Sequence, residues 1–319
     1  MAIKVRDYEV RLTRNKEERR MVRALRYAVF CEEEGASATE EQRTLREEYD
    51  SYDRFAEYMA VFHNGIVVGC YRIIDREAAE KMGSFYTETE FDLSKIKKVR
   101  GNIAEMSRAC VDPRYRDNAL VMRLLWAGLS EYVLRRKVRV LFGVASWVGQ
   151  KPGLSAHAIS YLYYNRLAPA RLRATVLTEN FHESVNPALS RMNIMPKIFV
   201  DEEEAFRQMP PLIKGYLRVG ADFGNGVFID KGFNTYDVFV TLQTKNISAT
   251  YQKHFLGSEN ALQDLSVDID EGAVKTIGKI VLFPVRGPLK VLGSFVKFLL
   301  REDAADAEYV DDSADKGEE

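Results

Sequence analysis

Two β-rich runs, MAVF at 59–62 and IVVGCYRII at 66–74, flank the tripeptide His63-Asn64-Gly65. Asn-Gly is the preferred dipeptide of tight hairpin turns because both residues tolerate a positive φ. The sequence therefore predicts an antiparallel hairpin over Tyr58–Ile74, around which the other elements must be arranged.

In the other segments, apolar residues recur either at every second position, as in a strand, or at every third or fourth position, as in a helix. Residues 36–48 are polar and fit either a mobile helix or a loop. Strands are expected at 8–12, 103–111, 138–147 and 233–242, and helices at 15–34, 118–137 and 157–167. This order predicts an α/β fold, with a mixed, twisted sheet flanked by helices on both faces.

Composition excludes several classes of protein. The 319 residues carry a formal net charge of −1, so no overall charge excess points to a nucleic-acid partner. Three cysteines are too few for a disulfide framework and are expected to be buried, reduced side chains. None of the four histidines is spaced as a metal pair, so we expect no metal. The charged first 20 residues do not resemble a secretory signal, and no run of 18 apolar residues predicts a membrane span.

Residues 215–232, GYLRVGADFGNGVFIDKG, contain five glycines. Glycine-rich segments can cradle phosphate, but this one lacks the spacing of the known phosphate-binding motifs. The favoured interpretation is a loop whose backbone approaches the substrate closely.

The C-terminal part changes character twice. An acidic linker begins at 258 and leads into 274–301, where lysines and arginines are interleaved with Ile, Val, Leu and Phe. Pro284 and Pro288 divide that segment into two short amphipathic helices, which are typical of a membrane interface. Packing against the sheet is the alternative. Residues 302–319 are acidic and are expected to be disordered.

Chemistry-bearing residues are spread over the first 116 positions. Arg26 and Phe30 lie in RYAVF, Asp50 and Asp53 lie in YDSYD, and Arg72 follows the hairpin turn. Taken alone, an Asp-x-x-Asp pair is more often a solvated turn than a site.

Glu105 and Arg108 are harder to dismiss, since they lie in an otherwise apolar strand and buried charges must be paired. Residues three apart in a regular strand face opposite sides, so a β-bulge would be needed to bring both to one side. The alternative is an ion pair that only stabilises the sheet.

Together these residues resemble the acyl-homoserine-lactone synthase branch of the GNAT acyltransferase superfamily. The chain resembles even more closely a sister family, the bacterial ornithine Nα-acyltransferases that make lyso-ornithine lipid. The resemblance covers roughly residues 5–257, and the expected N-acyltransferase domain is 1–257, followed by the linker and amphipathic helices of 258–301. It rests on seven motifs in order: FYTETEFDLS (85–94), EMSRACVDPRYR (105–116), LLWAGL (124–129), LFGVASW (141–147), SYLYYNRLAP (160–169), PPLIKGYLRVGA (210–221) and FNTYDVFV (233–240).

The resemblance implies a GNAT-like fold and transfer of a fatty acyl group, typically 3-hydroxyacyl, from an acyl carrier protein thioester to an amino acid α-amine. No tightly bound cofactor is implied. The chain departs from acetyl-CoA enzymes at 114–119, where RYRDNA replaces their glycine-rich pantetheine loop. That departure fits a carrier-protein donor. The segment from Arg108 to Arg139 contains eight basic residues and three acidic ones. This excess indicates either a basic surface for an acidic carrier or a solvated helix face.

The expected roles follow from amide chemistry. Glu105 would be the general base that takes the proton of the amine, and the N–H groups of a bulge would stabilise the oxyanion. Tyrosines at 161, 163 and 164 could supply an acid, although packing is the commoner role. Expected catalytic residues are Glu105 and Arg108; expected substrate-binding residues are Arg26, Phe30, Asp50, Asp53 and Arg72; expected carrier- or pantetheine-binding residues are Val111, Arg114, Arg116 and Asn118.

The arginines would compete for the substrate carboxylate, and the sequence does not rank them. Ornithine is the favoured acceptor, with glutamine, lysine or another amino acid as alternatives. Two further hypotheses are a signal synthase that uses S-adenosylmethionine and a non-catalytic, membrane-associated protein. The expected location is the cytoplasmic face of the inner membrane, with peripheral contact through 274–301.

Overall fold

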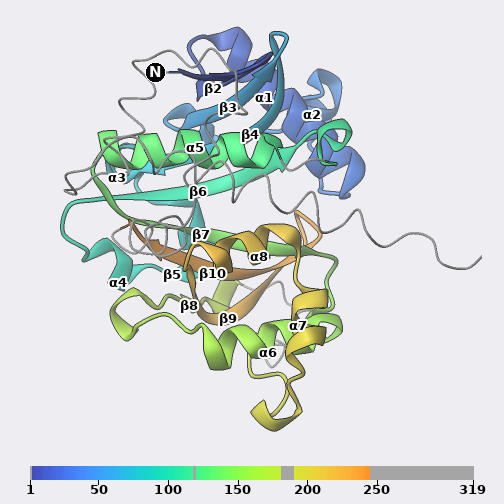
Figure 1. The fold of residues 1–319 in the computed structure, drawn as a ribbon, viewed down its shortest axis with the longest axis vertical. Helices are drawn as coiled ribbons and strands as arrows, with labels where there is room; N and C mark the ends of the chain where they lie inside the picture. The colour runs from blue at the N-terminus through green and yellow to red at the C-terminus, as the bar shows by residue number, and fades with distance from the viewer. Residues whose placement is uncertain (1, 118–119, 181–189, 245–319) are drawn as a thin grey trace, which may run out of the picture.

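The computed structural model describes residues 2–117, 120–180 and 190–244. Its strands form one twisted sheet in the order β1-β2-β3-β4-β6-β7-β10-β9-β8-β5 (Figure 1). The strands are β1 (Ala2–Val5), β2 (Tyr8–Leu12), β3 (Glu57–His63), β4 (Ile66–Asp75), β5 (Phe91–Asp92), β6 (Asn102–Val111), β7 (Val138–Val148), β8 (Thr175–Val176), β9 (Asp222–Asp230) and β10 (Thr235–Gln243).

Helices cover both faces of this sheet, as the sequence predicts. They are α1 (Lys16–Arg26), α2 (Glu40–Leu45), α3 (Arg76–Met82), α4 (Ser94–Lys97), α5 (Leu120–Arg135), α6 (Ala156–Asn165), α7 (Glu202–Gln208) and α8 (Pro211–Arg218). Helix α5 packs on one face of β2, β3, β4 and β6, and α6, α7 and α8 pack on the same side of β7, β9 and β10. Helices α1, α3 and α4 cover the opposite side.

Local sequence accounts for the elements that frame the first half. Asn64 and Gly65 have φ values of 49° and 80°, which confirms the predicted tight turn between β3 and β4. The Asn15 side chain accepts a hydrogen bond from the Glu18 N–H and so caps α1. The helix continues as a π-helical segment, Tyr27–Glu33, and ends at Gly35 with a φ of 79°.

The sheet opens in its middle, between β6 and β7. The two strands pair in parallel from Asn102 to Glu105, and the register ends where Glu105 faces Phe142. Gly143 follows at the point of closest approach, where a Cβ atom would lie 2.2 Å from the carbonyl oxygen of Met106. After Glu105, β6 has no further register with β7. Strand β7 stays paired with β10 as far as Val148, so the ends of β6 and β7 diverge and leave space between them.

The sequence interpretation was wrong at the glycine-rich stretch 215–232. This stretch is not a loop: it contains the end of α8 and the whole of β9. Gly224 and Gly226 lie within β9, where a Cβ would meet Phe239 and Val176 at 2.8 and 2.2 Å. These glycines therefore permit close packing of neighbouring strands rather than contact with a substrate.

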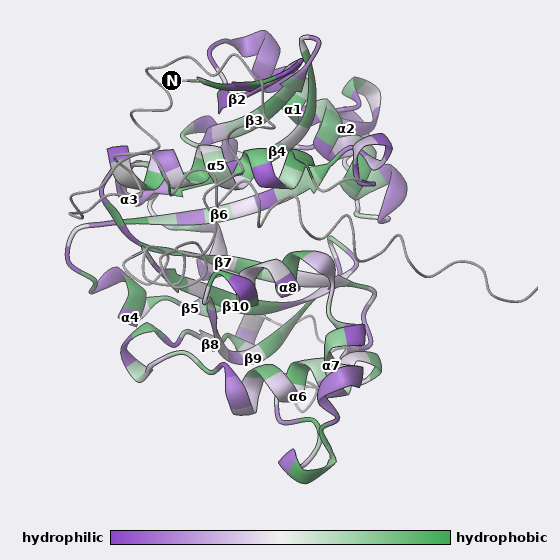
Figure 2. Ribbon diagram, in the orientation of Figure 1, coloured by the Kyte–Doolittle hydropathy of each residue, from purple (hydrophilic) through white to green (hydrophobic). Residues whose placement is uncertain are grey.

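Figure 2 shows that β4 and β10 are largely hydrophobic, whereas hydrophilic residues gather on the outer helices. Among the described residues, no helix combines the length and the apolar character needed to cross a bilayer. The proposed domain boundary at 257, the amphipathic segment 274–301 and the acidic tail 302–319 all lie outside the described residues.

Candidate active site

The predicted bulge is present in β6. This strand has one more residue than β4 between the partners Ser107 and Cys110. Within that interval Arg108 adopts a φ of 53°, which is unusual for a residue other than glycine. The extra residue resets the alternation of side chains, so that Arg108 reaches the carboxylate of Asp50, on the face that also carries Glu105.

Arg108 belongs to a buried network of three arginines and three carboxylates. Asp50 lies at its centre: it accepts bonds of 2.6 and 2.7 Å from Arg72 Nη1 and one of 3.1 Å from Arg108 Nη2. Burial acts to raise the pKa of Asp50, but the charges of the two arginines outweigh it and lower the pKa below its usual value. The network therefore consists of charged groups, and its members are Arg26, Glu48, Asp50, Asp53, Arg72 and Arg108.

Two of these arginines lie too deep to meet a substrate. Arg26 and Arg72 have no solvent exposure, and neither lines the cavity described below. Arg26 Nη1 donates to Asp53 at 2.9 Å and its Nε donates to Glu48. Arg72 Nε donates to the Ser107 hydroxyl at 3.0 Å. The geometry therefore gives them a positioning role, in contrast to the direct substrate contact expected from the sequence.

Glu105 is fully buried and lies two residues before Ser107, where the bulge begins. Its Oε2 accepts a 2.9 Å bond from the Thr87 N–H, while its Oε1 has no hydrogen-bond partner among the described residues. Burial raises the pKa of Glu105, although the Arg72 charge and the Thr87 bond oppose this. Glu105 does not line the cavity itself. Ser107, whose hydroxyl acts to lower the pKa of Glu105 and accepts a bond from Arg72 Nε, does line it, and is the nearest candidate to link the carboxylate to the cavity.

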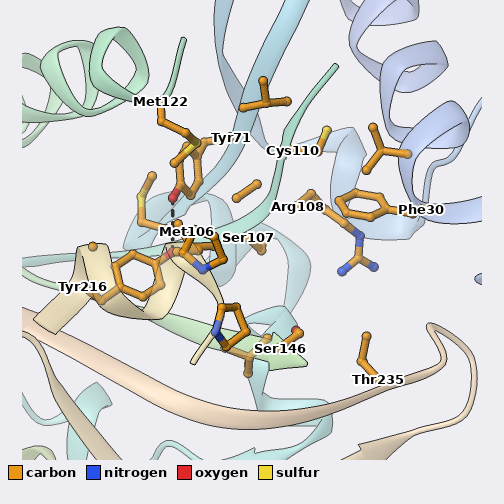
Figure 3. A pocket seen from close by; sticks show the side chains of 18 of the residues that line it. Phe30, Tyr71, Met106, Ser107, Arg108, Cys110, Met122, Ser146, Tyr216 and Thr235 are labelled. Atoms are coloured by element: carbon orange, nitrogen blue, oxygen red, sulfur yellow. Dashed lines mark hydrogen bonds between the residues drawn. The ribbon is translucent and has the colours of Figure 1, made fainter. Parts of the chain in front are cut away.

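A cavity of about 660 Å³ occupies the opening between β6 and β7. At its polar end the Arg108 guanidinium lies between two aromatic rings, 4.4 Å from the Tyr86 centroid and 4.1 Å from that of Phe233. Phe30 packs edge-on against Phe233 and lies beside Arg108, as Figure 3 shows. A planar guanidinium fixed in this way is suited to bind a carboxylate. Thr235 of β10 also lines this end.

The other end of the cavity is apolar and lies beneath α5 and α8. Its wall includes Met106, Met122, Trp126 and a hydrogen-bonded pair, Tyr71 and Tyr216, whose hydroxyls are 3.2 Å apart (Figure 3). A second hollow of about 70 Å³ lies behind the same residues. The cavity therefore passes through the sheet, with a cationic group at one end and an acyl-sized apolar channel at the other.

The residues expected to bind the acyl carrier lie in three different environments. Val111 and Arg116 line the cavity, and Arg116 makes bonds of 2.6 and 2.8 Å to the carboxylate of Glu33. Arg114 is exposed, is paired with Asp112 and does not line the cavity. Asn118 lies outside the described residues. Val111 and Arg116 therefore remain the best-placed candidates.

Two further expectations concern the basic residues between Arg108 and Arg139 and the tyrosines of α6. Five of the eight basic residues counted there, Arg108, Arg114, Arg116, Arg135 and Arg136, are paired with carboxylates, which reduces the expected basic surface. The tyrosines of α6 do not line the cavity. The hydroxyls at positions 161 and 164 bond to Glu202 and to a backbone carbonyl, which favours packing over acid catalysis.

Sequence reasoning missed a second group of carboxylates. Glu90, Asp230 and Asp237 bring one oxygen each to within 4.8 Å of one another, and the two aspartates line the cavity. Asp237 could have been found by the argument used for Glu105, because it interrupts an apolar strand. Glu48 was missed because it lies in the polar run before Asp50, where no periodicity distinguishes a buried side chain from an exposed one.

Comparison with known proteins is consistent with this geometry. Residues 25–127 match the family model described as "Acetyltransferase (GNAT) domain"; the match runs from the end of α1 to the middle of α5 and includes the bulge. Solved structures that resemble the fold include FeeM, an N-acyl amino acid synthase from uncultured soil microbes (TM-score 0.42, 13% identity, 76% of this chain and 94% of that one). They also include the AHL synthase LasI (TM-score 0.40, 16% identity, 74% and 90%).

Sequence relatives are much more similar. The L-ornithine N(alpha)-acyltransferase of Agrobacterium fabrum is 34% identical over 258 residues, which cover 78% of this chain and 85% of that protein. The protein of the same name from Rhodobacter capsulatus is 32% identical over 262 residues, 80% of this chain and 97% of that one. By this likeness along most of both chains, the protein belongs to the L-ornithine N(alpha)-acyltransferase family, with a GNAT-like fold.

Proposed function

We propose that this protein transfers a fatty acyl group, 3-hydroxyacyl by preference, from an acyl carrier protein thioester to the α-amine of ornithine, giving lyso-ornithine lipid. The observation that supports this most strongly is the cavity that crosses the sheet at the β6 bulge. Its two ends differ in chemistry as the two substrates do: Arg108 lies at one end and apolar side chains line the other. The names of the relatives agree with the acceptor.

The reaction needs a neutral amine beside a polarised thioester. The Arg108 guanidinium binds the acceptor carboxylate, and the acyl chain lies along Met106, Trp126 and the tyrosine pair. The amine nitrogen attacks the carbonyl carbon at the opening between β6 and β7. Backbone N–H groups at the bulge would stabilise the oxyanion there.

Proton transfer runs through the polar end. The amine gives up a proton to Glu105, by way of the Ser107 hydroxyl or a water molecule, as the C–N bond forms. Burial suits Glu105 to this task, because a base is most effective when its pKa lies near the working pH. The C–S bond then breaks, and the carrier thiolate leaves and takes up a proton.

A carrier protein as donor is supported by two features near the mouth of the cavity. The glycine-rich loop of acetyl-CoA enzymes is absent from 114–119. Arg116 lies on the cavity wall, where it can meet an acidic carrier or its phosphate once Glu33 is displaced. We further propose that 274–301 hold the protein at the cytoplasmic face of the membrane, where a single-chain lipid product would accumulate.

Mass spectrometry of the products of the purified chain tests the proposal. We expect N-acylornithine from 3-hydroxyacyl carrier protein and ornithine, and little product when glutamine or lysine replaces ornithine. Glutamine or lysine as the preferred acceptor would correct the substrate and leave the reaction intact.

Sedimentation with anionic vesicles tests the membrane contact, which a paired Lys290→Glu and Lys297→Glu change should weaken.

A further inference from the structure

The carboxylate cluster of Glu90, Asp230 and Asp237 has no role in the mechanism above. It lies where η3 (Tyr86–Thr89) runs into β5, facing the ends of β9 and β10. Glu90 and Asp237 are 2% and 3% exposed. Three ionised carboxylates so close together and so well buried repel one another, and the arrangement is unfavourable unless protons are taken up or a cation joins it.

The cluster has unused hydrogen-bonding capacity that faces inward. Both carboxylate oxygens of Glu90 and Oδ1 of Asp237 have no hydrogen-bond partner among the described residues. Asp230 uses one oxygen to accept a 2.9 Å bond from the Phe233 N–H. Asp230 and Asp237 also form part of the cavity wall, so a ligand in the cavity can reach the group.

The shape of the cluster suits a primary ammonium. Three N–H donors that bond to carboxylates at about 2.8 Å, at tetrahedral angles, require acceptors about 4.6 Å apart. The observed oxygens lie within 4.8 Å of one another, which permits that arrangement.

Burial, together with the neighbouring carboxylates, raises the pKa of Glu90 and of Asp237; the charge of Arg108 opposes this rise at both groups, so Arg108 lies within electrostatic reach of the cluster. The same cavity wall therefore presents the Arg108 guanidinium and the carboxylates of Asp230 and Asp237. An extended diamino acid holds its carboxylate and terminal ammonium roughly 6 Å apart, given bonds of about 1.5 Å. The charges of the protein and of such a ligand are complementary: the guanidinium matches the ligand carboxylate, and the protein carboxylates match the ligand ammonium.

We infer that Glu90, Asp230 and Asp237 bind the side-chain ammonium of a diamino acid acceptor, while Arg108 binds its carboxylate. This inference rests on the proposed function and adds to it the residues that select a cationic side chain over a neutral one. Glutamine and norvaline would leave the cluster without a cation, and they are discriminated against for that reason.

Calorimetric titration of the full-length protein with ornithine, and with norvaline as a neutral analogue of the same length, tests the inference without relying on turnover. We expect wild-type protein to bind ornithine at least tenfold more tightly than norvaline. Glu90→Gln or Asp237→Asn should weaken ornithine binding by about 10- to 100-fold, the effect of losing a buried charge-assisted bond, and leave norvaline unchanged.

Asp222→Asn is a matched control on the same strand as Asp230, because Asp222 pairs with Arg166 and does not line the cavity. It should leave both affinities unchanged. Thermal unfolding of the ligand-free proteins gives a second readout. Glu90→Gln and Asp237→Asn should melt at the same or a higher temperature, whereas loss of a merely structural carboxylate would lower it.

Three results would overturn the inference: equal affinities for ornithine and norvaline, including no binding of either; an ornithine preference that persists in both variants; or ornithine binding that requires added Mg²⁺ or Ca²⁺ and disappears with a chelator. Product formation by the wild-type protein is scored separately. A protein that selects ornithine but makes no N-acylornithine would contradict the proposed function and leave this inference standing.

Discussion

Replacing Glu105 by glutamine should lower the catalytic rate strongly and change the stability of the fold only slightly. The carboxylate is fully buried and makes one hydrogen bond to the backbone, through Oε2, while Oε1 has no hydrogen-bond partner among the described residues. A glutamine can keep the bond from Thr87 and place its NH2 group where Oε1 was. Removing a desolvated charge also relieves the burial penalty that raises the pKa of Glu105. We therefore expect the free energy of unfolding to change by no more than about 1 to 2 kcal/mol.

Turnover should fall far more. Loss of a general base lowers a rate by about 10²- to 10⁴-fold, which corresponds to roughly 3 to 5 kcal/mol of transition-state free energy. The assay is kcat/KM for N-acylation as a function of pH. The wild-type rate should rise with pH through a pKa above 4.5, and the variant should lose that limb. Glu131→Gln, a buried carboxylate on α5 that does not line the cavity, is the control. An unchanged rate, or a loss of activity matched by unfolding, would refute the role of Glu105.

Three other predictions follow from the charges of the site. Asp53→Asn leaves Arg26 and Arg72 with an unbalanced buried charge and should destabilise the fold by about 3 to 5 kcal/mol in urea denaturation, and a cost under about 1 kcal/mol would contradict the buried network. Burial raises the pKa of Asp237 to about 7, so the ligand-free protein should lose stability as pH rises from about 4 through 7, by up to about 4 kcal/mol, and Asp237→Asn should flatten this dependence. Arg116→Ala should raise KM for the acyl carrier about tenfold and leave KM for the amino acid unchanged, which steady-state kinetics with each substrate varied in turn would check.

Much of the fold can be predicted from the sequence, because its periodic segments are long and well punctuated. The Asn64-Gly65 turn, the helix expected from residue 15 and the apolar run of β7 each coincide with an observed element. The failures have physical causes. Strands β5 and β8 have two residues each, too few to show any period. Strand β9 was hidden by glycines that are needed for close strand packing.

Part of the site could be predicted from the sequence. The prediction failed where the role of a charged side chain depends on how deeply it is buried. A charged pair in an apolar strand correctly indicated the bulge at Arg108 and the burial of Glu105. Sequence order could not show that Arg72 points into a closed ion network rather than into the cavity, since both environments require a paired arginine. The cluster of Glu90 with two aspartates forms only when β5 meets β9 and β10, some 140 residues later along the chain.

The most direct test of the central claim is mass spectrometry of a reaction that contains the purified full-length protein, 3-hydroxyacyl carrier protein and ornithine, run beside the Glu105→Gln variant. The account predicts N-acylornithine from the wild-type protein and at least 100-fold less from the folded variant. Absence of any N-acyl amino acid from folded wild-type protein, with ornithine, glutamine and lysine each supplied, would contradict it.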